Sequence, residues 1–111
     1  MIYERPKYKN QYENFIGGEW IAPSSGEYIE NISPVDGKLL TKIPRSNEKD
    51  VDLAVEAAKK GFEEFKHTSV TQRSALLNKI ADIVEANLET LAAAETLDNG
   101  KPIRESRDVD L

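Results

Sequence analysis

Few residues of this sequence could do chemistry, and the most unusual of them is an aspartate near the end of a predicted helix. The stretch E-T-L-D-N-G-K-P, residues 95–102, has the pattern of a helix terminus. Gly100 suits a left-handed cap, and Pro102 prevents the helix from resuming at once. Asp98 then lies in the last turn, where the negative end of the helix dipole disfavours a carboxylate. Asp98 is therefore either solvated or placed to contact a positively charged group.

The other candidate catalytic groups are isolated from one another. The single histidine, His67, has no cysteine near it, because the sequence contains none. Two carboxylate pairs, Glu63-Glu64 and Asp108 with Asp110, could be proposed for acid-base catalysis, but their charged surroundings favour a solvated face. There is no phosphate-binding P-loop and no G-x-G-x-x-G motif. From these residues we expect no catalytic and no cofactor-binding residue in the chain.

Composition narrows the class of protein further. The 111 residues fit one small domain, and the formal net charge is -5, with Lys and Arg scattered among the acids. Nucleic acid and anionic membranes both require a basic surface, so we expect neither as a partner. No segment has the length of a signal peptide core or of a membrane span. We therefore expect a soluble, cytoplasmic protein, and the lack of cysteine fits a reducing compartment.

The first half of the chain predicts a small antiparallel β unit. Residues 15–16 and 19–21 flank a Gly-Gly pair, which suits the positive φ angles of a two-residue hairpin turn. Residues 28–32 and 39–43 are two further strands, separated by a turn that ends in Asp-Gly. Residues 1–13 are polar, and we expect them to form a flexible N-terminal arm.

The second half predicts amphipathic helices, so the fold class as it stands is α+β. Asn47 or the preceding serine caps a helix through about residue 66, and a second helix opens at Ser69. Asn87 is a possible break in the second helix, and residues 103–111 could begin a further one. A polar chain of this size is only marginally stable on such a core alone. We therefore expect a partner, or more chain, to cover part of the apolar helix faces.

Five motifs follow one another along the chain in the order found in a known family, and they resemble the motifs of that family. They are F-I-G-G-E-W (15–20), N-I-S-P-V-D-G-K (31–38), D-V-D-L-A-V-E-A-A (50–58), R-S-A-L-L-N-K-I-A-D (73–82) and E-T-L-D-N-G-K-P (95–102). Together they resemble the N-terminal segment of the NAD(P)-dependent aldehyde dehydrogenase superfamily. The residues of these motifs are most similar to those of the bacterial acetaldehyde or aliphatic aldehyde branch. The resemblance covers nearly all of residues 14–105.

The resemblance implies that residues 14–111 are the incomplete N-terminal part of a cofactor-binding and scaffold domain of an α/β fold. Family enzymes oxidise an aldehyde to an acid with NAD or NADP, using a cysteine thiolate and a glutamate that lie in later sequence. We accordingly expect this chain to be inactive alone and to bind no NAD or NADP by itself. Its partner would be the remainder of a dehydrogenase subunit, or a homo-oligomer. The alternative is a stand-alone interaction module that docks on a full-length subunit.

The resemblance also offers an explanation for Asp98. In many members a monovalent cation, potassium or sodium, lies near the loop that matches Asn31-Ile32. The backbone carbonyls of Asn31 and Ile32 and the carboxylate of Asp98 would be its ligands, and hard oxygen donors suit an alkali cation. The simpler alternative is that Asp98 hydrogen-bonds a neighbouring turn. Both interpretations stay open on the sequence.

Overall fold

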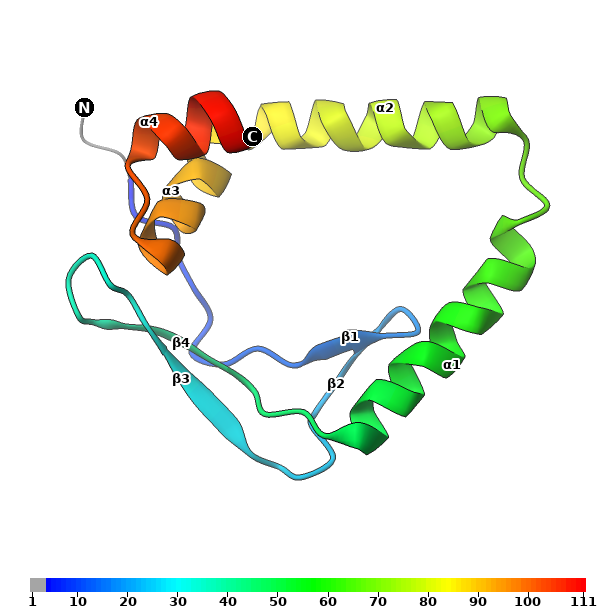
Figure 1. The fold of residues 1–111 in the computed structure, drawn as a ribbon, viewed down its shortest axis with the longest axis horizontal. Helices are drawn as coiled ribbons and strands as arrows, with labels where there is room; N and C mark the ends of the chain where they lie inside the picture. The colour runs from blue at the N-terminus through cyan, green and yellow to red at the C-terminus, as the bar shows by residue number, and fades with distance from the viewer. Residues whose placement is uncertain (1–3) are drawn as a thin grey trace. The chain divides into compact units, whose positions relative to one another are not determined.

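The computed structural model describes residues 4–111, which form two compact units (Figure 1). One unit combines the described residues up to Tyr8 with Asn31–Leu40 and Val70–Leu111. The other combines Lys9–Glu30 with Thr41–Ser69. Strands precede helices along the chain, which confirms the predicted α+β class.

The predicted Gly-Gly hairpin is confirmed. Strands β1 (Asn14–Ile16) and β2 (Glu19–Ile21) are antiparallel, with Phe15 opposite Trp20. The two glycines between them have φ angles of 62° and 85°, which residues with a Cβ rarely adopt. The rings of Phe15 and Trp20 pack at 5.0 Å between centroids, as expected for a cross-strand aromatic pair.

The second pair of strands, β3 (Tyr28–Ile32) and β4 (Leu39–Pro44), forms a separate two-stranded sheet. The predicted β unit therefore consists of two two-stranded sheets. Part of the expected N-terminal arm is also paired: the backbone N–H of Tyr12 donates to the carbonyl of Lys42 at 3.0 Å. Residues 1–3 of that arm lie outside the described residues, and its flexibility stays a prediction.

Helix α1 (Glu48–Phe65) begins at the predicted cap. The side chain of Asn47 accepts from the backbone N–H of Asp50, and the Asp50 carboxylate accepts from the backbone N–H of Asn47 at 2.9 Å. This reciprocal capping box satisfies donors that the first turn of a helix leaves free. Asp50 also accepts from the backbone N–H of Ser24 at 2.9 Å. These two donors lower the pKa of the Asp50 carboxyl below its ordinary value.

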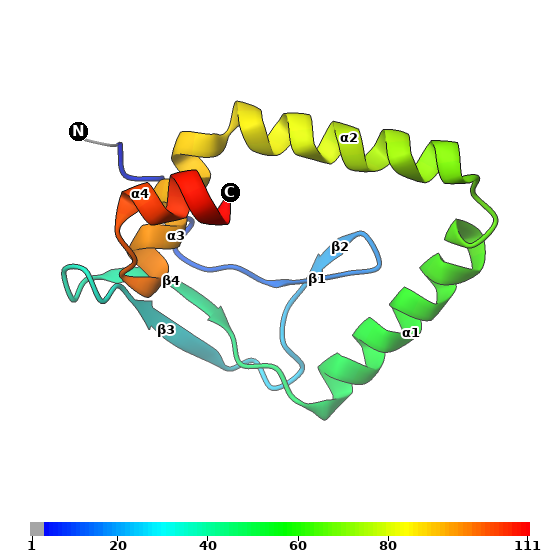
Figure 2. The same ribbon diagram turned by 45° about the horizontal axis from the view of Figure 1, so that its top comes forward.

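The predicted break at Asn87 is also confirmed. It separates α2 (Val70–Ala86) from α3 (Leu88–Asn99), and α3 leaves the end of α2 in a new direction (Figure 2). The side chain of Asn87 donates to the carbonyl of Ile83 at 2.8 Å, which satisfies a group at the end of α2. After Gly100 the chain forms a short helix α4 (Ile103–Glu105) and a π-helical turn η1 (Ser106–Asp110).

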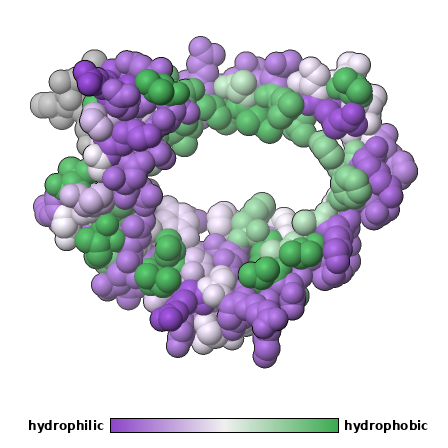
Figure 3. Space-filling view, viewed as in Figure 1, coloured by the Kyte–Doolittle hydropathy of each residue, from purple (hydrophilic) through white to green (hydrophobic). Residues whose placement is uncertain are grey.

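The buried apolar residues are few, and they lie on α3: Ala92, Ala93 and Leu97. Helix α2 buries no residue, and its Leu77 and Ile83 side chains are 67% and 55% exposed. Figure 3 shows hydrophobic surface running along this helix. The predicted surplus of apolar helix surface is therefore present. None of the helices within residues 4–111 has the length and apolar character needed to cross a bilayer.

Candidate functional site

The predicted site residues Asn31 and Asp98 are brought together at the C-terminal end of α3. The Asn31 side-chain amide nitrogen donates to a carboxylate oxygen of Asp98 at 2.7 Å, although the two residues are 67 positions apart. Asp98 is exposed and Asn31 is partly buried. Ile32, the third predicted residue, ends β3 beside Asn31 and is 46% exposed.

The turn after β3 is fastened to the end of α3 by a buried serine. Ser33 is fully buried, and its hydroxyl donates to the carbonyl of Leu97 at 2.6 Å. That carbonyl belongs to the last turn of α3, where carbonyls lack helical partners. The same hydroxyl accepts from the backbone N–H of Val35 at 3.2 Å, which shapes the turn. Ser33 therefore fixes the chain segment that carries Asn31 and Ile32.

Gly100 is the second point of contact between this turn and the helix. It has a φ of 80°, and its backbone N–H donates to the carbonyl of Thr96 at 2.8 Å, so it is the left-handed cap that the sequence predicts. A Cβ at this position would lie 3.2 Å from Cγ of Pro34. Glycine is therefore required both by the backbone conformation and by the approach of the turn.

A buried pair of hydroxyls supports α3 from the other side. The Thr96 and Ser106 side-chain oxygens are 3.0 Å apart, and both residues are buried. Their hydrogen bond joins the last turn of α3 to η1, and it gives each of the two buried hydroxyls a partner. Ser33, Thr96 and Ser106 are not among the site residues predicted from the sequence. Ser33 does open the turn predicted before residue 37, and Thr96 lies in the predicted helix terminus.

The basic side chains of Lys101 and Arg107, which follow α3 in the sequence, have carboxylate partners of their own. Lys101 pairs with Asp110, and Arg107 pairs with Glu89 at 3.3 Å. The hydrogen bond from Lys101 to Asp110 raises the pKa of Lys101, and the one from Arg107 to Glu89 raises the pKa of Arg107. Asp98 instead has an uncharged amide against one of its oxygens.

The predicted ligand groups are the Asp98 carboxylate and the backbone carbonyls of Asn31 and Ile32, all of them hard oxygen donors. Of the contacts among these residues, the structure gives the hydrogen bond between the Asn31 side chain and Asp98. Within residues 4–111 there is no group of three or more His, Cys, Asp or Glu side chains that could hold a metal ion. The simpler alternative requires only a hydrogen-bond partner for Asp98, and the side chain of Asn31 in β3 is such a partner.

The remaining candidates of the sequence analysis lie in ordinary surface settings. His67 follows α1, and its backbone N–H donates to the carbonyl of Glu64 at 3.3 Å. Glu63 pairs with Lys66 one helical turn away, and Asp108 pairs with the neighbouring Arg107 at 3.3 Å. These contacts agree with solvated faces more than with a catalytic pair.

The glycines within residues 4–111 do not form a pyrophosphate-binding turn. The glycines with positive φ within residues 4–111 are Gly17, Gly18, Gly26, Gly37 and Gly100. A pyrophosphate site requires a glycine-rich turn that opens directly into a helix N-terminus. None of these glycines immediately precedes one of the helices that begin at residues 48, 70, 88 and 103. We therefore assign no cofactor contact to these residues.

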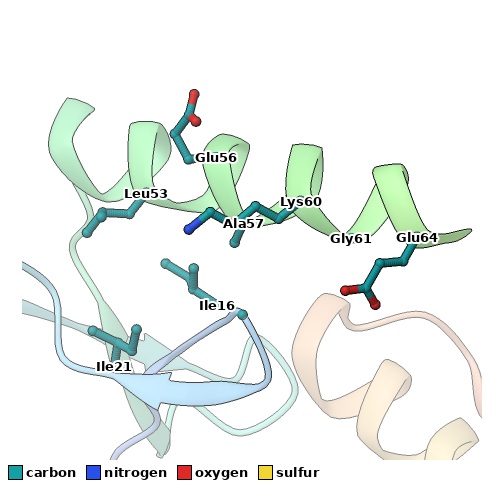
Figure 4. Close-up of a pocket in the computed structure, with 9 residues that line it drawn as sticks. Ile16, Ile21, Leu53, Glu56, Ala57, Lys60, Gly61 and Glu64 are labelled. Atoms are coloured by element: carbon teal, nitrogen blue, oxygen red, sulfur yellow. The ribbon is translucent and has the colours of Figure 1, made fainter.

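A shallow apolar hollow lies between the β1–β2 hairpin and α1 (Figure 4). Its volume is about 530 Å³, and it is lined by Ile16 and Ile21 of the hairpin and by Leu53 and Ala57 of the helix. Glu56, Lys60 and Glu64 line it as well, so it contains charges but no nucleophile with an adjacent base. Its lining indicates packing surface and not a reaction centre.

Comparison with known proteins identifies a family for nearly the whole chain. The model of the aldehyde dehydrogenase family matches residues 20–111. A long-chain-aldehyde dehydrogenase of Acinetobacter sp is 60% identical over 104 residues, which are 94% of this chain and 21% of that protein. An acetaldehyde dehydrogenase of Cupriavidus necator is 52% identical over 94% of this chain and 21% of its own length. This chain therefore spans about one fifth of the length of these relatives.

Solved structures give the same result for the fold. The structure of PnpE in complex with nicotinamide adenine dinucleotide matches with a TM-score of 0.83 and 41% identity, over 93% of this chain and 21% of that one. The apo structure of an indole-3-acetaldehyde dehydrogenase matches with a TM-score of 0.87 and 41% identity, over 93% of this chain and 25% of its own.

Proposed function

Because this chain belongs to the aldehyde dehydrogenase family, we propose that it serves as the N-terminal scaffold segment of an enzyme that oxidises an aldehyde to a carboxylic acid. The family reaction is NAD(P)-dependent, and two relatives act on aliphatic aldehydes by name. An aliphatic aldehyde, NAD or NADP as oxidant, and a cytoplasmic site of action belong to the same proposal.

The observation that carries this proposal is the exposed apolar face of α2. Leu76, Leu77, Ile80 and Ile83 are all at least 45% exposed, and the helix buries none of its residues. Burying one large aliphatic side chain contributes about 1.5–3 kcal/mol. We propose that the remainder of a dehydrogenase subunit covers this face, so that the segment contributes framework and not reacting groups.

The reacting groups of the family reaction are then supplied outside these 111 residues. A thiolate must attack the aldehyde carbon, and this sequence has no cysteine. We expect the purified chain to form no NADH from NAD and acetaldehyde. Mixing it with the remainder of a homologous subunit, expressed without its own N-terminal segment, should restore NADH formation. NADH formation by the chain alone, or none by the mixture although the two pieces bind, would contradict the proposal.

We also propose that Asp98, with the carbonyls of Asn31 and Ile32, holds a potassium or sodium ion. The position of Asp98 at the negative end of α3 favours positive charge there. Potassium should raise the melting temperature of the protein more than a large organic cation does. Asp98→Asn should abolish that difference, whereas Asp52→Asn, in the exposed first turns of α1, should retain it. Equal melting of the parent protein in both salts would refute the site.

A stand-alone interaction module remains the second candidate function, favoured by the same exposed helix face. In that case the chain would bind an intact dehydrogenase subunit that already carries its own N-terminal segment. Co-purification with an intact homologous subunit supports the module, and binding only to the subunit that lacks this segment supports the scaffold.

A further inference from the structure

The end of α3 contains the only asparagine of the sequence that is followed by glycine, Asn99-Gly100. Glycine has no Cβ to shield its backbone nitrogen, so that nitrogen can approach the preceding side chain closely. We propose that Asn99 is a site of spontaneous deamidation, and that the hydrogen bonds closing the end of α3 hold this reaction back.

The reaction requires only water and a general base. The backbone nitrogen of Gly100 loses its proton and bonds to the side-chain carbonyl carbon of Asn99. The side-chain amide nitrogen takes up a proton and leaves as ammonia, which gives a five-membered cyclic imide. Water then adds to one of the two imide carbonyls and breaks its bond to the shared nitrogen. The products are aspartate and isoaspartate, and no oxidant or reductant takes part.

Both reacting groups are engaged in the folded chain. The Gly100 N–H donates to the carbonyl of Thr96 at 2.8 Å, so this nitrogen is held within the helix cap. The Asn99 amide nitrogen donates to a carboxylate oxygen of Glu95 at 2.7 Å, and its oxygen accepts from the backbone N–H of Lys101 at 2.8 Å. Ring closure removes the Gly100 proton and expels the Asn99 amide nitrogen, so it breaks the contacts to Thr96 and Glu95, and it moves the oxygen that accepts from Lys101. Local opening of the cap must therefore come first.

The product would weaken the same end of the helix. A carboxylate at residue 99 would replace the amide that now bonds Glu95, and it would stand next to Asp98 in the last turn. Like charges repel, and the negative end of the helix dipole disfavours a further anion. Isoaspartate would also lengthen the backbone by one carbon immediately before Gly100, whose cap lies against Pro34. Deamidation should therefore loosen the turn that Ser33 fastens to α3.

The test is peptide mapping of the purified 111-residue chain after incubation in mildly alkaline buffer. The reference is the free peptide of residues 95–102, in which these hydrogen bonds are not maintained. We expect Asn99 to deamidate before every other asparagine, and more slowly in the chain than in the peptide. In urea the chain should reach the rate of the peptide. Faster deamidation at another asparagine, or equal rates in folded chain and peptide, would overturn the proposal.

Two substitutions of Glu95 test whether its hydrogen bond to the Asn99 amide slows deamidation. Glu95→Ala removes the acceptor of the Asn99 amide and should accelerate deamidation about two- to thirteenfold, the factor that one net hydrogen bond is worth. Glu95→Gln keeps an oxygen acceptor and should leave the rate near that of the parent. Circular dichroism establishes that both variants retain their helices. Equal rates in the Ala and Gln variants would show that this contact does not restrain Asn99.

Discussion

Replacing Gly100 by alanine tests the contact between the turn after β3 and the end of α3. Gly100 has a φ of 80°, a conformation that costs a residue with a Cβ about 1–2 kcal/mol. The new Cβ would also lie 3.2 Å from Cγ of Pro34, which forces the turn to shift. Overpacking of this kind costs at least about 1 kcal/mol. We expect Gly100→Ala to destabilise its unit by about 2–3 kcal/mol.

Gly37→Ala is the matched control, because it separates backbone strain from the steric contact. Gly37 belongs to the same unit and has a φ of 69°, but a Cβ there would meet no atom within 4 Å. Its replacement should cost only the backbone term of about 1–2 kcal/mol. The double variant with Pro34→Ala removes the neighbour, and the coupling energy between Gly100→Ala and Pro34→Ala should be about 1 kcal/mol.

The assay is urea denaturation followed by the helical circular dichroism signal, with sucrose added to widen the stability margin. Equal destabilisation by Gly100→Ala and Gly37→Ala, together with no coupling to Pro34, would refute the reasoning. It would mean that the turn and the helix end do not meet as closely as 3.2 Å implies.

Three further predictions use other contacts. The pKa of Asp50 is lowered in the fold, so its carboxylate stabilises the protein above the unfolded pKa of about 3.9, and this contribution is lost as pH falls through the lower folded value. Asp50→Asn should therefore make the melting temperature fall less steeply as the pH is lowered. Parallel melting-temperature profiles of the variant and the parent protein would contradict this. Asn31→Ala frees the carboxylate of Asp98 from its amide partner and should enlarge the melting-temperature gain from potassium; an unchanged gain would mean that amide and cation do not compete. Leu77→Gln should weaken binding to the remainder of a subunit about tenfold, as expected for one buried leucine, whereas Lys79→Gln on the same helix should not; equal affinities in a titration would exclude this face.

Local signals in the sequence account for the ends of the elements. Asn47 opens α1, Asn87 separates α2 from α3, and Gly100 closes α3, each through a hydrogen bond or dihedral angle that depends on residues within four positions. Such interactions are specified by short motifs, so they are visible in sequence. The prediction of small antiparallel strands was confirmed, whereas their division into two two-stranded sheets depends on contacts that short motifs do not encode.

The candidate site also combines features that the sequence predicts with features that it does not. Its residues were predicted from the family resemblance, whereas the hydrogen bonds that hold their chain segments in place join residues far apart in the sequence. The hydroxyl of Ser33 meets the carbonyl of Leu97 across 64 positions, and no periodicity or capping rule links the two residues. The Thr96–Ser106 pair is similarly unpredictable, because no short motif links the two hydroxyls.

The separation between Ser33 and Leu97 also sets an order of events during synthesis. At about 5–20 residues per second, a ribosome needs about 3–13 s to add the 64 residues between them. The unit formed by Lys9–Glu30 and Thr41–Ser69 is complete in sequence well before Leu97 is made. The turn at Ser33 thus stays without its helical partner while that unit can already fold. Nascent chains arrested before and after Leu97 should accordingly differ in protease resistance at this turn, and equal resistance would argue against the order.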